Sequence, residues 1–225
     1  VKHFVLVSTD EVYGSLGPEG KFREDTPLSP NSPYSASKAG ADLLALAYYH
    51  THGLPVTITR CCNNYGPYQY PEKMLPLFIT NAMEEQTVPV YGDGLFVRDW
   101  IHVLDHCSGI ETVWLKGQTG EVYNIGSDCE LRNIDLTKLI LQECGRSEIL
   151  IRYVKDRPGH DRRYAIDHGK ISSKLGWEPS IPFGRGLKET ISWYKKHSDW
   201  WHSIKLQDPK YREFYERQYV KRVEQ

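Results

Sequence analysis

The segment Ser8-Thr9-Asp10-Glu11-Val12-Tyr13-Gly14 constrains this chain more than any other. It follows Phe4-Val5-Leu6-Val7, an apolar run that predicts a buried parallel strand. A hydroxyl and two carboxylates therefore fall at the carboxyl end of a strand, where open α/β sheets place their ligands. Asp10 and Glu11 can divide acid and base work if their surroundings separate their pKa values. Taken alone, the segment is explained equally well as a polar turn.

A second pattern begins at Tyr34 and Lys38, which lie four residues apart in a predicted helix. Ser32 and Pro33 predict the start of that helix, and Gly53 predicts its end. Its predicted apolar face is formed by Leu43, Leu44, Ala47 and Tyr48. Tyr34 and Lys38 share one face, and a cation beside a phenol lowers the pKa of the phenol. Alone, this is a common surface pair; beside the polar strand end, it indicates an acid–base site.

The rest of the chain alternates between predicted strands and helices, which favours an α/β fold. Strands are expected at 55–60, 88–91, 121–125 and 149–154, and helices at 74–85, 104–115, 134–143, 170–175 and 186–197. Within 134–143, the inward residues are expected to be Leu136, Leu139 and Ile140. The tail from Asp208 spaces its aromatic residues as a helix does, at Tyr211, Phe214, Tyr215 and Tyr219.

Composition narrows the class of protein. The 225 residues fit one domain or one and a half, and the formal charge of −1 argues against nucleic acid as a partner. No apolar run reaches membrane-spanning length, and no signal peptide is visible. Five cysteines without a Cys-x-x-Cys pair favour free thiols in a reducing cytoplasm. His102 and His106 have helical spacing but no third ligand, so we expect a helix-start pair and no metal site.

Beyond these patterns, the chain resembles a known family. Ser8–Gly14 followed by Tyr34-Ser35-Ala36-Ser37-Lys38 resembles the extended short-chain dehydrogenase/reductases that act on nucleotide sugars, and most closely the dTDP-glucose 4,6-dehydratases. The resemblance continues, in the family's order, through five further segments: Asn63–Lys73, Pro89–Gly92, Arg98–Trp100, Tyr123–Gly126 and Asp156–Tyr164.

This resemblance implies a doubly wound Rossmann-type parallel sheet with a smaller α/β substrate-binding domain. Residues 1–60 and 99–128 are expected to belong to the NAD-binding domain, and residues 61–98 and 129–225 to the nucleotide-sugar-binding domain. The family's glycine-rich dinucleotide turn is not in this sequence, and Gly14-x-x-Gly17-x-x-Gly20 is expected to be a loop. We therefore expect an N-terminally truncated form that is inactive by itself.

The resemblance also implies roles in a conversion of dTDP-glucose to a 4-keto-6-deoxy sugar with NAD. Tyr34 would take the proton of the 4-hydroxyl, and Thr9 would bind the 4-oxygen. Glu11 would remove the proton at the 5-position, and Asp10 would protonate the departing 6-hydroxyl. Lys38 would bind the nicotinamide ribose. The implied cofactor residues are Ser8, Tyr34, Lys38 and Asn64.

The substrate residues implied in the same way are Asn63, Lys73, Met74, Pro89, Tyr91, Arg98, Asn133, Arg157 and His160. Among them, Tyr91 would stack on the base, while Arg98, Arg157 and His160 suit a diphosphate. A homodimer is implied through the helix that carries Tyr34. Two alternatives stay open: another nucleotide-sugar enzyme (UDP-glucuronate decarboxylase, epimerase or other 4,6-dehydratase), or an inactive nucleotide-sugar-binding fragment. Asp10 favours a dehydratase, because only a dehydratase needs an acid for the 6-hydroxyl.

Overall fold

The computed structural model describes residues 1–221 and divides the chain into two compact units. Unit 1 comprises Val1–Asn64, Val97–Glu130 and Gly159–Ile181, and unit 2 comprises Tyr65–Phe96, Leu131–Pro158 and Pro182–Gln225. Residues 159–181, which the family resemblance assigns to the nucleotide-sugar-binding domain, lie in unit 1, because Phe22 pairs with Ile166 and helix α5 (Gly169–Leu175) packs on strand β6 (Val122–Ile125).

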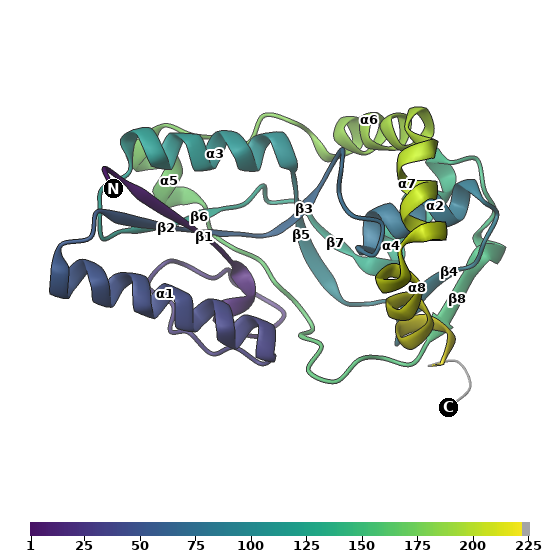
Figure 1. The fold of residues 1–225 in the computed structure, drawn as a ribbon, viewed down its shortest axis with the longest axis horizontal. Helices are drawn as coiled ribbons and strands as arrows, with labels where there is room; N and C mark the ends of the chain where they lie inside the picture. The colour runs from purple at the N-terminus through teal and green to yellow at the C-terminus, as the bar shows by residue number, and fades with distance from the viewer. Residues whose placement is uncertain (222–225) are drawn as a thin grey trace. The chain divides into compact units, whose positions relative to one another are not determined.

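Unit 1 is built on a parallel sheet with the strand order β1-β2-β6. In Figure 1, α1 covers one face of this sheet, and α3 with α5 covers the other. The parallel α/β class predicted from the sequence is thereby confirmed. The elements of unit 1 not yet bounded are β1 (Phe4–Thr9), a 3-10 helix (Asp10–Tyr13), α1 (Pro33–His52), β2 (Val56–Cys61), β5 (Val97–His102) and α3 (Val103–Lys116). The strands β3 (Asn63–Tyr65) and β7 (Glu130–Arg132) pair in the order β3-β5-β7.

Strand β1 is less buried than its apolar sequence predicts. It lies at the edge of the sheet, and Phe4 and Val7 are 42% and 39% exposed. Its carboxyl end differs, since Ser8 and Thr9 are buried. The polar strand end therefore lies deeper in unit 1 than the apolar residues before it.

Helix α1 has the predicted ends. The Ser32 hydroxyl accepts from the backbone N–H of Ser35 in a capping box, and Gly53 ends the helix with a φ of 66°. The face that packs inward is formed by small and polar residues, Ser35, Ala39, Asp42 and Ala45. The predicted apolar face therefore does not pack on the sheet: Leu43, Leu44 and Tyr48 are exposed. Small side chains let the helix approach the sheet closely, so the larger ones point outward.

A buried ion pair fastens α1 to the sheet. Arg60 Nε of β2 donates to Asp42 Oδ2 over 2.9 Å, and both side chains are at most 4% exposed. Arg60 Nη1 donates over 2.9 Å to the hydroxyl of Tyr13, which in turn donates over 2.8 Å to Asn124 Oδ1. The guanidinium also lies 4.8 Å from the centre of the Tyr13 ring. The network around the Arg60 guanidinium thus joins four elements: α1, β2, β6 and the 3-10 helix.

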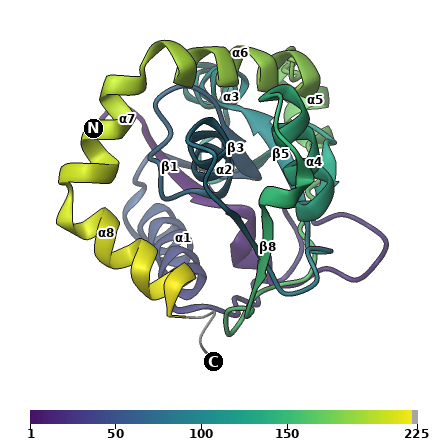
Figure 2. The ribbon, with the colours of Figure 1, turned by 90° about the vertical axis from the view of Figure 1, so that its right-hand side faces the viewer.

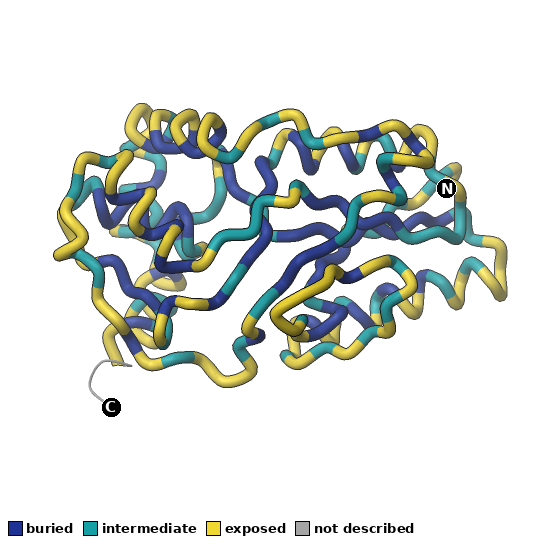
Figure 3. Tube along the Cα trace, turned by 180° about the vertical axis from the view of Figure 1, so that it is seen from behind, coloured by how far each residue is buried: buried dark blue, intermediate teal, exposed yellow. Residues whose placement is uncertain are grey.

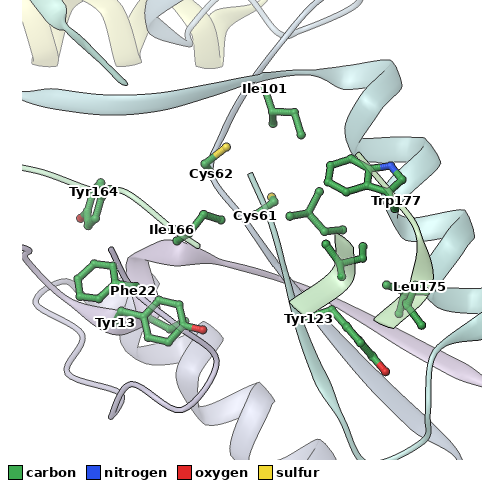
Figure 4. Packing of buried hydrophobic residues seen from close by; sticks show 14 of the residues in the cluster. Tyr13, Phe22, Cys61, Cys62, Ile101, Tyr123, Tyr164, Ile166, Leu175 and Trp177 are labelled. Carbon is green, nitrogen blue, oxygen red and sulfur yellow. The ribbon is translucent and has the colours of Figure 1, made fainter. Parts of the chain in front are cut away.

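The hydrophobic core of unit 1 includes the ring of Tyr13, which also belongs to this network. Figure 4 shows the ring pair of Tyr13 and Phe22, whose centroids lie 5.0 Å apart, near Ile166 and Tyr164. Cys61 and Cys62 extend the same cluster toward Ile101 and Trp177. In Figure 3 the central strands are dark blue, whereas much of the outer surface of the helices is yellow. The core of unit 1 therefore includes residues next to the polar end of β1, namely Val12 and Tyr13.

Unit 2 contains a two-stranded parallel sheet, β4 (Val88–Tyr91) with β8 (Ile151–Val154). Its helices are α2 (Met74–Met83), α4 (Asn133–Glu143), a 3-10 helix (Glu148–Leu150), α6 (Phe183–Lys196), α7 (Ser198–Gln207), α8 (Pro209–Tyr215) and a π-helical turn (Glu216–Val220). Figure 2 faces this unit and shows α2 between α4 and the run α7–α8. On α4, Leu136 and Ile140 are buried as predicted, but Leu139 is 37% exposed and was wrongly placed inward.

We expect Asp42→Asn to destabilise the protein by about 3–5 kcal/mol, because it leaves the buried guanidinium of Arg60 without its counter-charge. Urea unfolding at neutral pH measures this loss. The double variant Asp42→Leu/Arg60→Met should recover most of it, since no buried charge remains. Asp25→Asn, in the exposed pair with Arg23 (3.9 Å), is the matched control and should change stability by less than about 0.5 kcal/mol. An equal effect of the two single variants would contradict the role of the buried pair.

Candidate functional site

The site is built where β1 ends. Thr9 caps the 3-10 helix, and its hydroxyl accepts from the backbone N–H of Glu11 over 3.3 Å. The turn closes at Gly14, whose φ is +86° and whose missing side chain leaves room for the carbonyl of Ser29. A Cβ at Gly14 would lie 2.3 Å from that carbonyl oxygen, so only glycine fits. The turn therefore holds Asp10 and Glu11 at the strand end.

Asp10 is buried and its carboxyl is protonated at neutral pH. It is 2% exposed, and burial raises its pKa to about 8, with the charges of Glu11 and Asp99 adding to the rise. Thr9 Oγ1 donates to Asp10 Oδ1 over 3.3 Å, while Oδ2 has no hydrogen-bond partner among residues 1–221. A neutral carboxylic acid with one oxygen that makes no hydrogen bond can donate its proton to a bound acceptor.

Glu11 has different surroundings from its neighbour, because its side chain is only partly buried. The two adjacent carboxyls thus meet different dielectric environments, as expected from the sequence. The charge of Glu11 acts on Asp10 and also on Tyr34 of α1, where it raises the pKa of the phenol after burial. Glu11 therefore couples electrostatically to both Asp10 and Tyr34.

Tyr34 and Lys38 lie on α1 beside this strand end. Tyr34 is 56% exposed, and Lys38 Nζ donates to the carbonyl of Val7 over 2.6 Å. We expected Lys38 to lower the pKa of Tyr34. In the structure the pKa of Tyr34 is raised instead, by burial and by the charges of Glu11, Cys61 and Asp10. The Lys38 ammonium is fixed to the strand end and is not among the groups that shift the pKa of Tyr34.

The ends of β1 and β2 carry further polar groups. Ser8 Oγ is buried without a hydrogen-bond partner among the described residues. Asn64 donates to the carbonyl of Cys62 over 3.2 Å and to Cys61 Sγ over 3.4 Å, and its Oδ1 lies 2.9 Å from His106 Nδ1. Asn63, partly buried, begins β3. Burial raises the pKa of the Cys61 thiol to about 12, so this thiol is protonated and unreactive.

The two predicted helix-start histidines have structural contacts. His102 Nδ1 accepts from the backbone N–H of Leu104 and so caps α3. His106 contacts Asn64, and burial lowers its pKa to about 4. No group of three metal-ligating side chains is found among residues 1–221, and within that range no helix is long and apolar enough to cross a membrane.

Arg98 belongs to unit 1 and lies near the carboxyl site. Its Nη2 donates to the Asp161 carbonyl over 2.9 Å, and its guanidinium lies 4.4 Å from the centre of the Tyr164 ring. The charge of Arg98 also lowers the pKa of Asp10 and so partly opposes the effect of burial. His160, another predicted diphosphate residue, lies in the same unit.

The remaining predicted substrate residues belong to unit 2, namely Lys73, Met74, Pro89, Tyr91, Asn133 and Arg157. Lys73 and Met74 lie at the start of α2, and Asn133 is the first residue of α4. Pro89 and Tyr91 lie on β4, and Arg157 is exposed in the loop after β8. Asn133 is 8% exposed, and its Oδ1 has no partner among residues 1–221.

Two groups of this site were missed in the sequence. One is the Asp42–Arg60 pair, whose only signal is an arginine inside the predicted strand 55–60. The other is Asp99, whose Oδ1 accepts from the backbone N–H of Cys129 over 2.8 Å and whose charge raises the pKa of Asp10. Asp99 was noted only as part of a family segment.

Comparison with known proteins places this chain in a family. Residues 1–190 match the family model described as GDP-mannose 4,6 dehydratase. A dTDP-glucose 4,6-dehydratase of Streptomyces niveus is 55% identical over 91% of this chain. The chain spans 61% of that relative's length.

Solved structures agree with this comparison. A dTDP-glucose 4,6-dehydratase of Bacillus anthracis in complex with NAD is 57% identical, with a TM-score of 0.86 over 89% of this chain and 64% of its own. Another, from Streptomyces venezuelae and also with NAD bound, is 52% identical, with a TM-score of 0.89 over 91% of this chain and 63% of its own. Both support the Rossmann-type fold predicted from the sequence.

Replacing Asp10 by Asn should flatten the dependence of stability on pH. The native carboxyl keeps its proton up to about pH 8, whereas the unfolded one loses it near pH 3.8. Stability contributed by this group therefore falls as pH rises between these values, by about 1.4 kcal/mol per unit. Neutral His106 gives the opposite slope between about pH 4 and 6.5, so the Asp10 effect is clearest from pH 6.5 to 8.

Urea unfolding across pH 6.5–8 measures this slope. Asp10→Asn should lose most of it, and Asp25→Asn, at an exposed position, should keep it. The same slope in Asp10→Asn as in the unmodified chain would show that Asp10 is ionised in the folded state.

Glu11→Gln should lower the pKa of Tyr34, because it removes the charge that contributes most to the rise after burial. The ring resonances of Tyr34, followed by NMR through alkaline titration and assigned with Tyr34→Phe, measure this shift. Glu19→Gln, in the exposed loop after Gly14, is the control and should leave the titration unchanged. A Tyr34 titration that Glu11→Gln does not move would rule out the electrostatic coupling.

Proposed function

We propose that this chain, which belongs to the GDP-mannose 4,6 dehydratase family, carries the acid–base residues and nucleotide-sugar residues of a dTDP-glucose 4,6-dehydratase that works with NAD. The observation that carries the proposal is the protonated, buried Asp10 beside the partly exposed Glu11. A dehydration needs an acid for the leaving hydroxyl and a base for the neighbouring carbon, and these two carboxyls meet both needs. The relatives named dTDP-glucose 4,6-dehydratase support this choice of substrate.

The residues at the strand end fit one end of a dinucleotide. Ser8 Oγ is a buried polar atom without a partner in the described chain, and Lys38 presents an ammonium beside it at the end of β1. Ser8, Tyr34, Lys38 and Asn64 would hold the nicotinamide ribose end of NAD. When bound, NAD supplies a hydride acceptor for the sugar's 4-position and a hydride donor for its 6-position.

The chain's own residues would handle the protons. Tyr34, whose pKa is raised, takes the proton of the 4-hydroxyl only after losing its own, and Thr9 turns its hydroxyl from Asp10 to donate a hydrogen bond to the 4-oxygen. Glu11, ionised, removes the proton from the 5-position, which the 4-keto group acidifies. Asp10, neutral, gives its proton to the 6-hydroxyl, so that water leaves. Glu11 then returns a proton to the 5-position as the 6-position is reduced, which gives a 4-keto-6-deoxy sugar with one water molecule released per sugar.

Residues proposed to bind the nucleotide are found in each unit. In unit 2, Tyr91 stacks on the base, while Lys73, Met74, Pro89 and Asn133 line its surroundings. The unpartnered Oδ1 of Asn133 gives a buried acceptor for a nucleotide donor. Arg98, Arg157 and His160 bind the diphosphate, since guanidinium groups match phosphate oxygens. Asn63 contacts the sugar.

We further propose a cytoplasmic homodimer, formed through α1. Three large side chains on the outer face of this helix, Leu43, Leu44 and Tyr48, are 50–60% exposed. A helix with one face on its own sheet and a second apolar face outward suits an isologous contact, in which the same face of each copy meets the other. Free thiols suit a reducing compartment.

The test uses the complete gene product that contains this chain. With dTDP-glucose and NAD it should give a product that absorbs in alkali, as 4-keto sugars do, and it should exchange the 5-proton for solvent deuterium. Asp10→Asn should lower turnover by about 10²–10⁴-fold at the elimination step, and Glu11→Gln should abolish exchange at the 5-position. Asp25→Asn should retain full turnover.

Several outcomes would contradict the proposal. Absence of the keto product with dTDP-glucose, together with product from UDP-glucuronate or GDP-mannose, would assign another substrate. Unchanged turnover in Asp10→Asn or Glu11→Gln would remove that residue from the mechanism.

A further inference from the structure

The C-terminal segment of unit 2 contacts the residue proposed to stack on the base. This segment consists of α8 (Pro209–Tyr215) and the π-helical turn Glu216–Val220. It follows residue 190, where the match to the family model ends. Short π-helical turns are rare and are frequent at functional sites.

Two side chains of the turn hold Tyr91. The rings of Tyr91 and Tyr219 have centroids 5.5 Å apart and planes inclined by 30°. The Tyr91 hydroxyl donates to Gln218 Oε1 over 3.4 Å, and Tyr219 also hydrogen-bonds to Tyr91. The ring of Tyr91 is thus constrained both along its face and at its hydroxyl.

Tyr219 is itself firmly placed. It is 8% exposed, and its ring lies 5.4 Å from that of Tyr215 and 6.2 Å from that of Phe214. The charge of Arg157 also acts on its hydroxyl. Tyr219 therefore links the proposed base residue, Tyr91, with the proposed diphosphate residue, Arg157, inside one unit.

We propose that Tyr219, assisted by Gln218, is a positioning residue that fixes the ring of Tyr91 for stacking on the nucleotide base. The inference rests on the proposed function for the identity of the ligand. Tyr91 is only partly buried, and without these contacts its ring would rotate among several orientations. Ordering it before binding lowers the entropy lost when the base stacks. Tyr219 is buried and held by its own segment, so it supports Tyr91 and does not take the place of a base.

The first experiment measures the binding of thymidine diphosphate to the complete gene product that contains this chain by calorimetry. Tyr219→Ala should weaken binding at least tenfold, whereas Tyr219→Phe, which keeps the ring contact, should stay within threefold. Gln218→Ala, at a partly exposed position, should weaken binding by about threefold. Tyr153→Ala is the matched control, because Tyr153 is a 56% exposed tyrosine on β8, the partner strand of β4.

Unchanged affinity in both Tyr219→Ala and Gln218→Ala would overturn the proposal. Tighter binding in Tyr219→Ala would also overturn it, since that result would mean that Tyr219 competes with the base.

The second experiment reads the ring of Tyr91 without any nucleotide. In protein labelled with 3-fluorotyrosine, the ¹⁹F resonance of Tyr91 is assigned by its loss in Tyr91→Phe. Tyr219→Ala and Gln218→Ala should each shift this resonance and narrow it, because the ring turns more freely. A Tyr91 resonance unchanged in both variants would overturn the positioning role. If the unmodified chain binds no thymidine diphosphate but the resonance moves, the proposed substrate fails while the positioning of Tyr91 stands.

Discussion

The buried ion pair between Asp42 and Arg60 is the constraint on which the candidate site depends. Arg60 lies on the central strand of the unit 1 sheet, in register with Ser8 on one side and Asn124 on the other. A charge at that position must be neutralised, and Asp42 of α1 does so. Asp42 follows Lys38 by four residues and Tyr34 by eight, so all three share one side of the helix. Fixing Asp42 therefore fixes the height and rotation at which Tyr34 and Lys38 meet the strand end, and the bond from Arg60 to Tyr13 fixes the turn that carries Asp10 and Glu11.

The proposed acid–base pair depends on a contrast in burial between two adjacent residues, Asp10 and Glu11. Asp10 turns into unit 1, where desolvation and the charges of Glu11 and Asp99 keep it neutral at physiological pH. Glu11 remains in contact with solvent. A 3-10 helix begins at the end of β1, so both side chains leave one short turn in different directions. The difference in burial between the two carboxyls therefore arises from backbone geometry as much as from residue type.

Local features of the fold could be predicted from the sequence, whereas long-range polar contacts could not. The ends of α1 follow from Ser32 and Gly53, because capping involves only neighbouring residues. The buried face of α1 did not follow from hydrophobicity, because close packing selected Ala39 and Ala45 over the leucines. In the same way, the motifs placed Asp10, Glu11, Tyr34 and Lys38 in one unit, but not the bond from Lys38 to the Val7 carbonyl. The influence of Asp99 on Asp10 joins residues far apart in sequence, and no local pattern encodes such a pair.

Alkylation of the cysteines in unit 1 can measure local unfolding around the carboxyl end of β1. Cys61 and Cys62 are buried where β2 ends, in the same cluster as Tyr13, whereas Cys107 on α3 is exposed. Burial raises the pKa of both buried thiols, so neither alkylates while the strand end is closed. Once Cys107 has been blocked under native conditions, the rate at which Cys61 and Cys62 react reports the free energy of local opening around them. Mass spectrometry of the alkylated cysteines thus measures how often the turn at the end of β1 becomes exposed, without unfolding the rest of the chain.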